Sequence, residues 1–205
     1  MDGTGRGVDF ITIDGGEGGT GAAPLVFADH VALPFRIGFS RVYRVCAERG
    51  LHESVVFVGS GKLGLPESAF LGMALGCDLL SVGREAMLAV GCIQAQRCHT
   101  GHCPTGVATQ NRWLMRGLVP VEKGPRLANY VRTLRKELLR LSHACGVEHP
   151  ALLASGRIEF LQPDGNARSL RRVFGYQDAW GRPSKEDRDG IRRLMREKSR
   201  TTPAG

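Results

Sequence analysis

Residues 8–24 read VDFITIDGGEGGTGAAP, in which an apolar run leads directly into a glycine-rich loop. The run Val8–Ile13 is rich in β-branched and aromatic residues and predicts a strand. Five glycines follow it, and because glycine has no Cβ, their backbone N–H groups can approach another molecule closely. Pro24 suits the first turn of a helix, and Thr20 is a candidate capping residue. The stretch therefore predicts a strand, a ligand-facing loop and a helix.

The same succession of strand, glycine turn and helix occurs twice more along the chain. Val55–Val58 leads into GSGKLG and a helix that starts at Pro66, and Leu79–Val82 leads into GRE and another helix. The first of these runs is continuously apolar, which predicts a strand buried on both faces. Strands that alternate with helices favour parallel pairing, so the three glycine loops are expected at one edge of a sheet. Ligands of α/β proteins bind at this edge, and loops that feed helix N-termini favour a phosphate group.

Two longer helices complete the pattern. One is expected at Pro34–Glu48, before Gly50, and the other at Pro125–Ala144, whose leucines recur at helical spacing. The fold class is therefore α/β, and we expect the C-terminal portion, about three βα units, of a TIM (β/α)8 barrel. Such a piece exposes a strand edge that is normally paired, so it is expected to be unstable alone.

A change in composition near residue 160 divides the chain into two parts. Residues 1–160 contain the strand–loop–helix units and the cysteines, and residues 161–205 form a basic tail that is expected to be partly disordered. The formal charge of the chain is +8, and 11 Lys and Arg against 5 Asp and Glu from Asn166 to Gly205 account for +6 of it. The one helix candidate in the tail, Ser184–Lys198, sets basic residues beside apolar ones. This pattern favours a solvated or loosely docked surface helix over a nucleic-acid contact.

The overall composition, with 42% hydrophobic and 23% charged residues, is typical of a globular protein. No apolar run is long enough to cross a membrane, and the N-terminus lacks the basic and apolar regions of a signal peptide. We therefore expect a cytoplasmic protein that has no membrane contact. In that reducing compartment the six cysteines are expected to remain free of disulfides.

Three cysteines crowd into one short segment: Cys92, Cys98 and Cys103. Gly101 and Pro104 interrupt any helix there, so the segment must loop back on itself. Thiolates from a looping segment are the usual ligands of an iron–sulfur cluster. Zinc would need a fourth ligand, which His99 or His102 can supply. Reduced cysteines without a metal are the third alternative.

Four stretches together resemble the FMN-binding glutamate synthase family, the synthase domain of the glutamate synthase large subunit. They are, in the family's order, GGEGGTGAAP, SGKLG, GREAMLAVGC and CIQAQRCHTGHCPTGVATQ. The resemblance covers about residues 5–160, and the cysteine block is its specific part. It implies an oxidoreductase acting on CH–NH2 donors, built as a (β/α)8 barrel. In it, FMN reduces 2-iminoglutarate, formed from 2-oxoglutarate and ammonia, to glutamate, while a 3Fe-4S cluster relays electrons.

The resemblance also implies roles for individual residues. The catalytic positions, beside the flavin ring and the substrate, would be Glu17 and Thr20. Other flavin contacts in that loop would be Gly18, Gly19 and Gly21. The residues that clamp the flavin phosphate would be Ser60, Gly61, Lys62, Gly83 and Arg84. The ligands of the cluster would be Cys92, Cys98 and Cys103.

For three of these residues, an ordinary structural role is an alternative to flavin or substrate binding. Lys62 stands where the family has the second glycine of a pair, so its side chain must point away or join the phosphate contacts, and it can equally be an exposed loop lysine. Arg84 can form a salt bridge with Glu85 instead of binding phosphate. Glu17 can be a solvated loop acid.

The family also has parts that this sequence lacks, namely the domain that frees ammonia from glutamine and the earlier barrel strands. The expected partners are therefore an upstream polypeptide carrying the missing barrel half, an electron-donor subunit or a ferredoxin, and 2-oxoglutarate or glutamate as the small-molecule substrate. Two other functions remain open: a small metal-binding or iron–sulfur electron-transfer module without flavin turnover, and an inactive truncated fragment.

Overall fold

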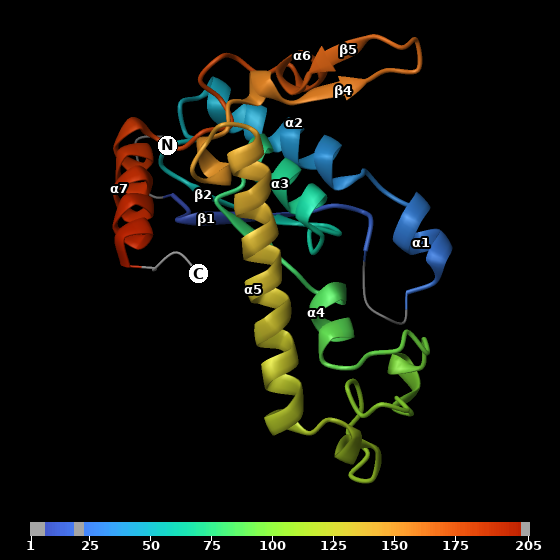
Figure 1. Ribbon diagram of the computed structural model, residues 1–205. Coiled ribbons are helices and arrows are strands. Elements are labelled where there is room, and N and C mark those ends of the chain that lie inside the picture. Colours follow the sequence, from blue (N-terminus) through green and yellow to red (C-terminus); the bar gives the residue numbers. More distant parts are fainter. Residues whose placement is uncertain (1–6, 19–22, 202–205) are drawn as a thin grey trace.

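The computed structural model describes residues 7–18 and 23–201 (Figure 1). Its first half repeats strands and helices in the expected succession. The elements are β1 (Phe10–Asp14), α1 (Leu25–His30), α2 (Phe35–Glu48), β2 (Val56–Ser60), α3 (Pro66–Leu75), β3 (Leu79–Ser81) and α4 (Arg84–Ala89). Two short 3-10 turns, Cys98–Thr100 and Leu114–Gly117, then lead to the long helix α5 (Pro120–Ala144).

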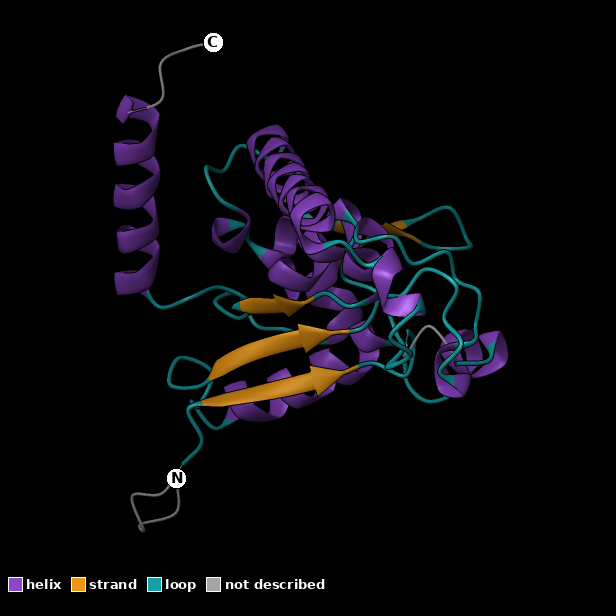
Figure 2. Cartoon of the chain, turned by 90° about the horizontal axis from the view of Figure 1, so that it is seen from below, coloured by secondary structure: helices purple, strands orange, loops and turns teal. Residues whose placement is uncertain are grey.

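The three strands form one parallel sheet in the order β1-β2-β3. Ile13 pairs with Gly59 in the first ladder, and Ser60 pairs with Ser81 in the second. Figure 2 shows the three arrows pointing the same way, so the loops that follow them leave from one edge. The predicted α/β class and the parallel pairing are thus confirmed.

The core lies between one face of this sheet and the helices. Phe39 and Tyr43 of α2 are buried against Phe57 of β2, with ring centroids 6.1 Å and 5.1 Å from the Phe57 ring. Gly76 ends α3 in the left-handed conformation, and a Cβ there would lie 2.6 Å from the Tyr43 ring. Glycine at this helix end therefore serves both the backbone turn and the close packing of the aromatic cluster.

The opposite face of the sheet is not covered by the described residues. Phe10, Val56 and Leu79 point to that side and are 64%, 40% and 58% exposed. The expectation that the second strand is buried on both faces is therefore not met in this chain. The reason is geometric: the helices that follow the strands pack on one side of the sheet only (Figures 1 and 2).

The segment after residue 158 contains more structure than its composition predicts. It forms an antiparallel hairpin of β4 (Glu159–Leu161) and β5 (Ala167–Ser169), followed by α6 (Leu170–Phe174) and α7 (Lys185–Thr201). Leu170, Tyr176 and Trp180 belong to the main core. The Tyr176 hydroxyl donates to the Leu75 carbonyl at 2.9 Å, and the Gly181 N–H donates to the Tyr43 hydroxyl at 2.9 Å. Residues 158–180 therefore contribute to the same core as the sheet, whereas no residue of α7 belongs to it in the described part of the chain.

None of the helices in residues 7–18 and 23–201 combines the length and the apolar character needed to cross a membrane.

Candidate functional site

The loops after the three parallel strands converge on one polar cavity of about 200 Å3. Each of the three loops contributes to the wall, as the parallel order of the strands predicts. The lining residues are Asp14, Glu17, Gly18, Ser60, Gly61, Lys62, Leu63, Ser81, Gly83, Arg84 and Glu85. The structure thus brings together seven of the residues singled out in the sequence: Glu17, Gly18, Ser60, Gly61, Lys62, Gly83 and Arg84. Gly19, Thr20 and Gly21 lie outside the described residues.

The glycine loop after β1 is held by the protein's own backbone. Three glycine N–H groups donate to carbonyls of other segments: Gly15 to Ser60 at 2.8 Å, Gly16 to Leu33 at 2.7 Å, and Gly18 to Ala28 at 2.9 Å. A Cβ on Gly16 would lie 2.4 Å from the carbonyl oxygen of Val31. Close packing against protein backbone is therefore one reason for glycine here, in addition to the close approach of a ligand that the sequence predicts.

Glu17 lines the cavity and also caps a helix. Both of its carboxylate oxygens accept the backbone N–H of Phe35, at 2.7 Å and 2.6 Å. Phe35 is the first residue of α2, where unpaired N–H groups and the helix dipole favour a negative charge. This contact joins residues 18 positions apart, so no local sequence pattern announces it.

Arg84 ties the third loop to the first. Its Nη2 donates to the Gly18 carbonyl at 2.5 Å, while its Nε is buried without a hydrogen-bond partner in the described residues. No ion pair joins Arg84 to Glu85 in this described part of the chain. A buried guanidinium donor beside a polar cavity suits an anionic ligand, because charged N–H groups bind phosphate and carboxylate strongly.

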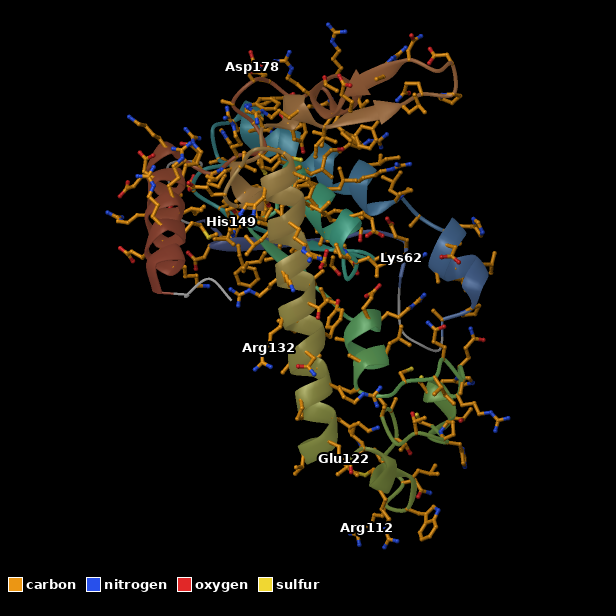
Figure 3. All side chains as sticks on the ribbon, viewed as in Figure 1. Lys62, Arg112, Glu122, Arg132, His149 and Asp178 are labelled. Atoms are coloured by element: carbon orange, nitrogen blue, oxygen red, sulfur yellow. The ribbon has the colours of Figure 1, made fainter. Side chains whose placement is uncertain are left out.

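Lys62 has a backbone conformation that is uncommon for a residue with a side chain. Its φ is +50°, in the left-handed region that glycine adopts at least cost. Its ammonium forms an ion pair with Asp29 of α1, and this contact holds the pKa of the Asp29 carboxyl below its usual value. The side chain is directed to α1, the side on which Figure 3 labels it, which leaves the backbone of the loop beside the cavity.

The glycines of the second and third loops differ in what surrounds them. A Cβ on Gly61 would lie 2.9 Å from Cβ of Phe35, and Gly61 has a φ of +139°. A Cβ on Gly83 would meet no atom within 4 Å. Packing and backbone conformation thus account for Gly61, whereas Gly83 leaves open space at the cavity wall.

The cysteine segment lies beyond α4, at the end of α5 that is remote from the β4–β5 hairpin (Figure 1). Cys103 is buried, and Cys92 and Cys98 are half-buried. Across residues 7–18 and 23–201, no three His, Cys, Asp or Glu side chains converge on the position of a single metal ion. The choice among an iron–sulfur cluster, zinc with His99 or His102 as fourth ligand, and reduced cysteines therefore stays a prediction.

Cys103 has the electrostatic surroundings of a thiolate. The Thr105 hydroxyl, with its oxygen 3.5 Å from the sulfur, and the nearby backbone N–H groups of Thr105, Val107 and Ala108 lower the pKa of the Cys103 thiol to about 7. The thiolate is the form that binds metals. In the same segment Gln94 and Gln96 hold positive φ values of 54° and 55°, a strained conformation that often accompanies functional loops.

Comparison with known proteins identifies relatives over most of the chain. Residues 3–148 match the family model described as the conserved region in glutamate synthase. The chain is 39% identical over 166 residues to the glutamate synthase large subunit-like protein YerD of Bacillus subtilis, covering 81% of this chain and 32% of that protein. It is 37% identical over 171 residues to the archaeal glutamate synthase [NADPH] of Methanocaldococcus jannaschii, covering 83% and 33%. It is also 35% identical over 142 residues to the ferredoxin-dependent glutamate synthase of Cyanidium caldarium, covering 69% and 9%. The chain thus spans about a third of the length of the first two relatives.

Proposed function

Because the chain belongs to the glutamate synthase family, we propose that it supplies part of an FMN-dependent oxidoreductase that forms glutamate. The reaction is the reduction of 2-iminoglutarate, which arises from 2-oxoglutarate and ammonia. The single observation that carries this proposal is the convergence of three glycine loops and Arg84 on one polar cavity. Since the chain spans about a third of its relatives, the complete reaction is assigned to the protein that contains the remaining strands.

The residues around the cavity fit the phosphate end of FMN. The buried Nε of Arg84 is a donor that a phosphate oxygen can accept from. The open space at Gly83 allows a ligand to approach the backbone there. The Ser60 hydroxyl and the backbone of Gly61 and Lys62 complete this clamp. FMN, when bound, supplies the hydride chemistry, and the protein positions it.

The first loop has the task of placing the substrate. In this proposal Glu17 and Thr20 lie beside the flavin ring and the substrate, and Gly18, Gly19 and Gly21 allow the ring to approach. Support comes from the way the loop is fixed, since the Glu17 carboxylate is anchored at α2 and the Gly18 carbonyl is bound by Arg84. One arginine thereby couples the phosphate clamp to the substrate loop, so that both keep one relative orientation.

Cys92, Cys98 and Cys103 are proposed to hold a 3Fe-4S cluster, whose chemistry is electron transfer. The thiolate surroundings of Cys103 and the strained loop at Gln94 and Gln96 support this assignment. The electron donor is proposed to be a separate subunit or a ferredoxin.

The uncovered face of the sheet supports a larger barrel. Phe10, Val56 and Leu79 are apolar and exposed on one face of a parallel sheet, and parallel sheets are normally covered on both faces. We assign this face to the interior of a (β/α)8 barrel whose other strands come from an upstream polypeptide.

Two measurements on the 205-residue chain test the proposal. The first is titration with FMN, followed by quenching of flavin fluorescence, and the second is the content of iron and sulfide after anaerobic purification. The chain is then co-expressed with the part of the Bacillus subtilis relative YerD that it does not cover. The assay measures oxidation of the reduced flavin that depends on ammonia and 2-oxoglutarate. Iron and sulfide without any FMN binding, also in the co-expressed protein, would contradict the proposal and support an electron-transfer module.

A further inference from the structure

A second cavity, with no residue in common with the glycine-loop site, lies between α5 and α7. Its volume is about 460 Å3, within the usual size range of small-ligand sites. Most of its wall is apolar: Leu138, Leu139, Pro150, Ile191, Leu194 and Met195. Figure 2 shows α7 set apart from the helices that cover the sheet, and the Leu194 side chain remains 63% exposed. A ligand with an apolar chain would therefore remove exposed apolar surface from water.

The polar part of the wall carries more positive than negative groups. Arg135, His149 and Lys198 line the cavity together with one acid, Glu197. Figure 3 places His149 in the space between α5 and α7. Its Nδ1 accepts the Ala151 N–H at 3.3 Å, so in the neutral ring the proton is on Nε2, which can donate to a ligand.

The pKa of the His149 ring is also affected by the charges around it. Burial first, and then the charges of Arg135 and Lys198, lower its pKa. A neighbouring negative charge would offset the two cations. This is the electrostatic environment in which an anionic group is favoured over a neutral one.

We propose that the cavity between α5 and α7 binds an amphiphilic carboxylate, with its apolar chain among the leucines and its carboxylate at Arg135 and His149. Apolar lining, cationic groups and volume together define this class of ligand. The volume favours a small molecule, because it lies within the usual range of small-molecule pockets.

The experiment uses the 205-residue chain and decanoate as the probe, at concentrations below those at which decanoate forms micelles. Calorimetry measures affinity and stoichiometry, and the NMR signal of the His149 ring C–H reports binding at the proposed place. We expect one saturable site and a shift of the His149 signal. Arg135→Gln, and separately replacement of the carboxylate by the alcohol in decan-1-ol, should each weaken binding about tenfold, as loss of a charge-assisted contact does.

Two further variants separate the site from general surface binding. Leu194→Asn should weaken decanoate binding through the apolar wall. Arg132→Gln should leave it unchanged, because Arg132 is an exposed arginine of the same helix that does not line the cavity and donates to Asn129. Equal affinity for decanoate and decan-1-ol, no shift of the His149 signal, or a dimer that closes the cavity in sedimentation would each overturn the proposal. None of these outcomes bears on FMN binding at the glycine loops.

Discussion

The carboxylate of Glu17 binds the backbone N–H of Phe35, with oxygen-to-nitrogen distances of 2.7 Å and 2.6 Å. Phe35 begins α2 and packs its ring against Phe39, with centroids 5.3 Å apart. The loop proposed to place the substrate is therefore fastened to the aromatic core through one acid. The position of Glu17 depends on the helix as much as on the loop.

Replacing Glu17 by alanine should destabilise the folded chain by about 1 kcal/mol, because the first N–H of α2 loses its acceptor and the helix N-terminus loses a negative charge. Glu17→Gln keeps an acceptor and should cost less. Urea denaturation followed by circular dichroism measures both free energies of unfolding. Equal stability of the alanine variant and the unchanged chain would show that the cap contributes nothing.

Gly83→Val should abolish tight FMN binding without destabilising the fold, because a side chain at Gly83 meets no protein atom within 4 Å but occupies the space beside the cavity. Gly59→Val is the contrasting variant. A Cβ there would lie 2.6 Å from Sγ of Cys77 and 2.9 Å from Cζ of Phe35, so we expect a loss of about 1–3 kcal/mol from overpacking. Flavin fluorescence and thermal unfolding of both variants test the pair. Unchanged FMN retention by Gly83→Val would remove the phosphate assignment.

Cys98→Ser should eliminate the iron–sulfur absorbance and the bound iron, since a hydroxyl is a poor substitute for a thiolate ligand. Cys46→Ala is the matched control, because Cys46 packs against the main core and is proposed to bind no metal. Iron and sulfide analysis after anaerobic purification provides the measurement. Full iron content in Cys98→Ser would contradict the ligand assignment.

Tyr43→Phe should destabilise the chain by about 1–3 kcal/mol, because it leaves the buried Gly181 N–H without an acceptor. The Tyr43 side chain is buried in the core, and this burial raises the pKa of its hydroxyl to about 12. Tyr130→Phe removes a hydroxyl that donates to the Gly64 carbonyl from a half-buried position, where water can replace it, and should cost less. Chemical denaturation compares the two. A larger loss for Tyr130→Phe would indicate that the Gly181 contact does not hold the C-terminal segment.

Acidification should destabilise the folded chain in part through His149. Its pKa is lowered from 6.5 by burial and by Arg135 and Lys198, and Glu197 is the one acid among the described residues that line the same cavity. Because the unfolded chain binds this proton more readily, unfolding takes up a proton below pH 6.5. The contribution is thus complete above that pH and is lost as the pH falls through the folded pKa.

The variant His149→Asn isolates this effect, since asparagine can still accept the Ala151 N–H but does not titrate. Urea denaturation at about pH 7.5 and about pH 5.5 should show a smaller loss of stability in the variant than in the unchanged chain. The same loss in both would assign the pH dependence to other groups.

The parallel pairing of the strands and the convergence of the glycine loops are predictable from the sequence, because strands that alternate with helices favour parallel pairing. The cap between Glu17 and Phe35 and the ion pair of Lys62 with Asp29 are not predictable, because each joins a loop to a helix that only the folded chain brings beside it. The expected start of the long helix at Pro125 is also late by one turn, since α5 begins at Pro120 and accommodates the second proline.

The elements after residue 158 show a second limit of prediction from sequence. β4, β5 and α6 are too short for hydrophobic periodicity to reveal them. Tyr176 contacts Tyr43 of α2 and Leu75 of α3, which are more than a hundred residues away in the sequence, and Trp180 packs against Tyr176. Basic composition alone therefore does not predict these elements.

The exposed sheet face at Phe10, Val56 and Leu79 affects how readily the chain is degraded in a cell. Without the strands that are proposed above to complete the barrel, these side chains are the kind of surface that chaperones bind and proteases sample. Under that proposal, the 205-residue chain should accumulate to a higher level when the remaining strands are co-expressed with it.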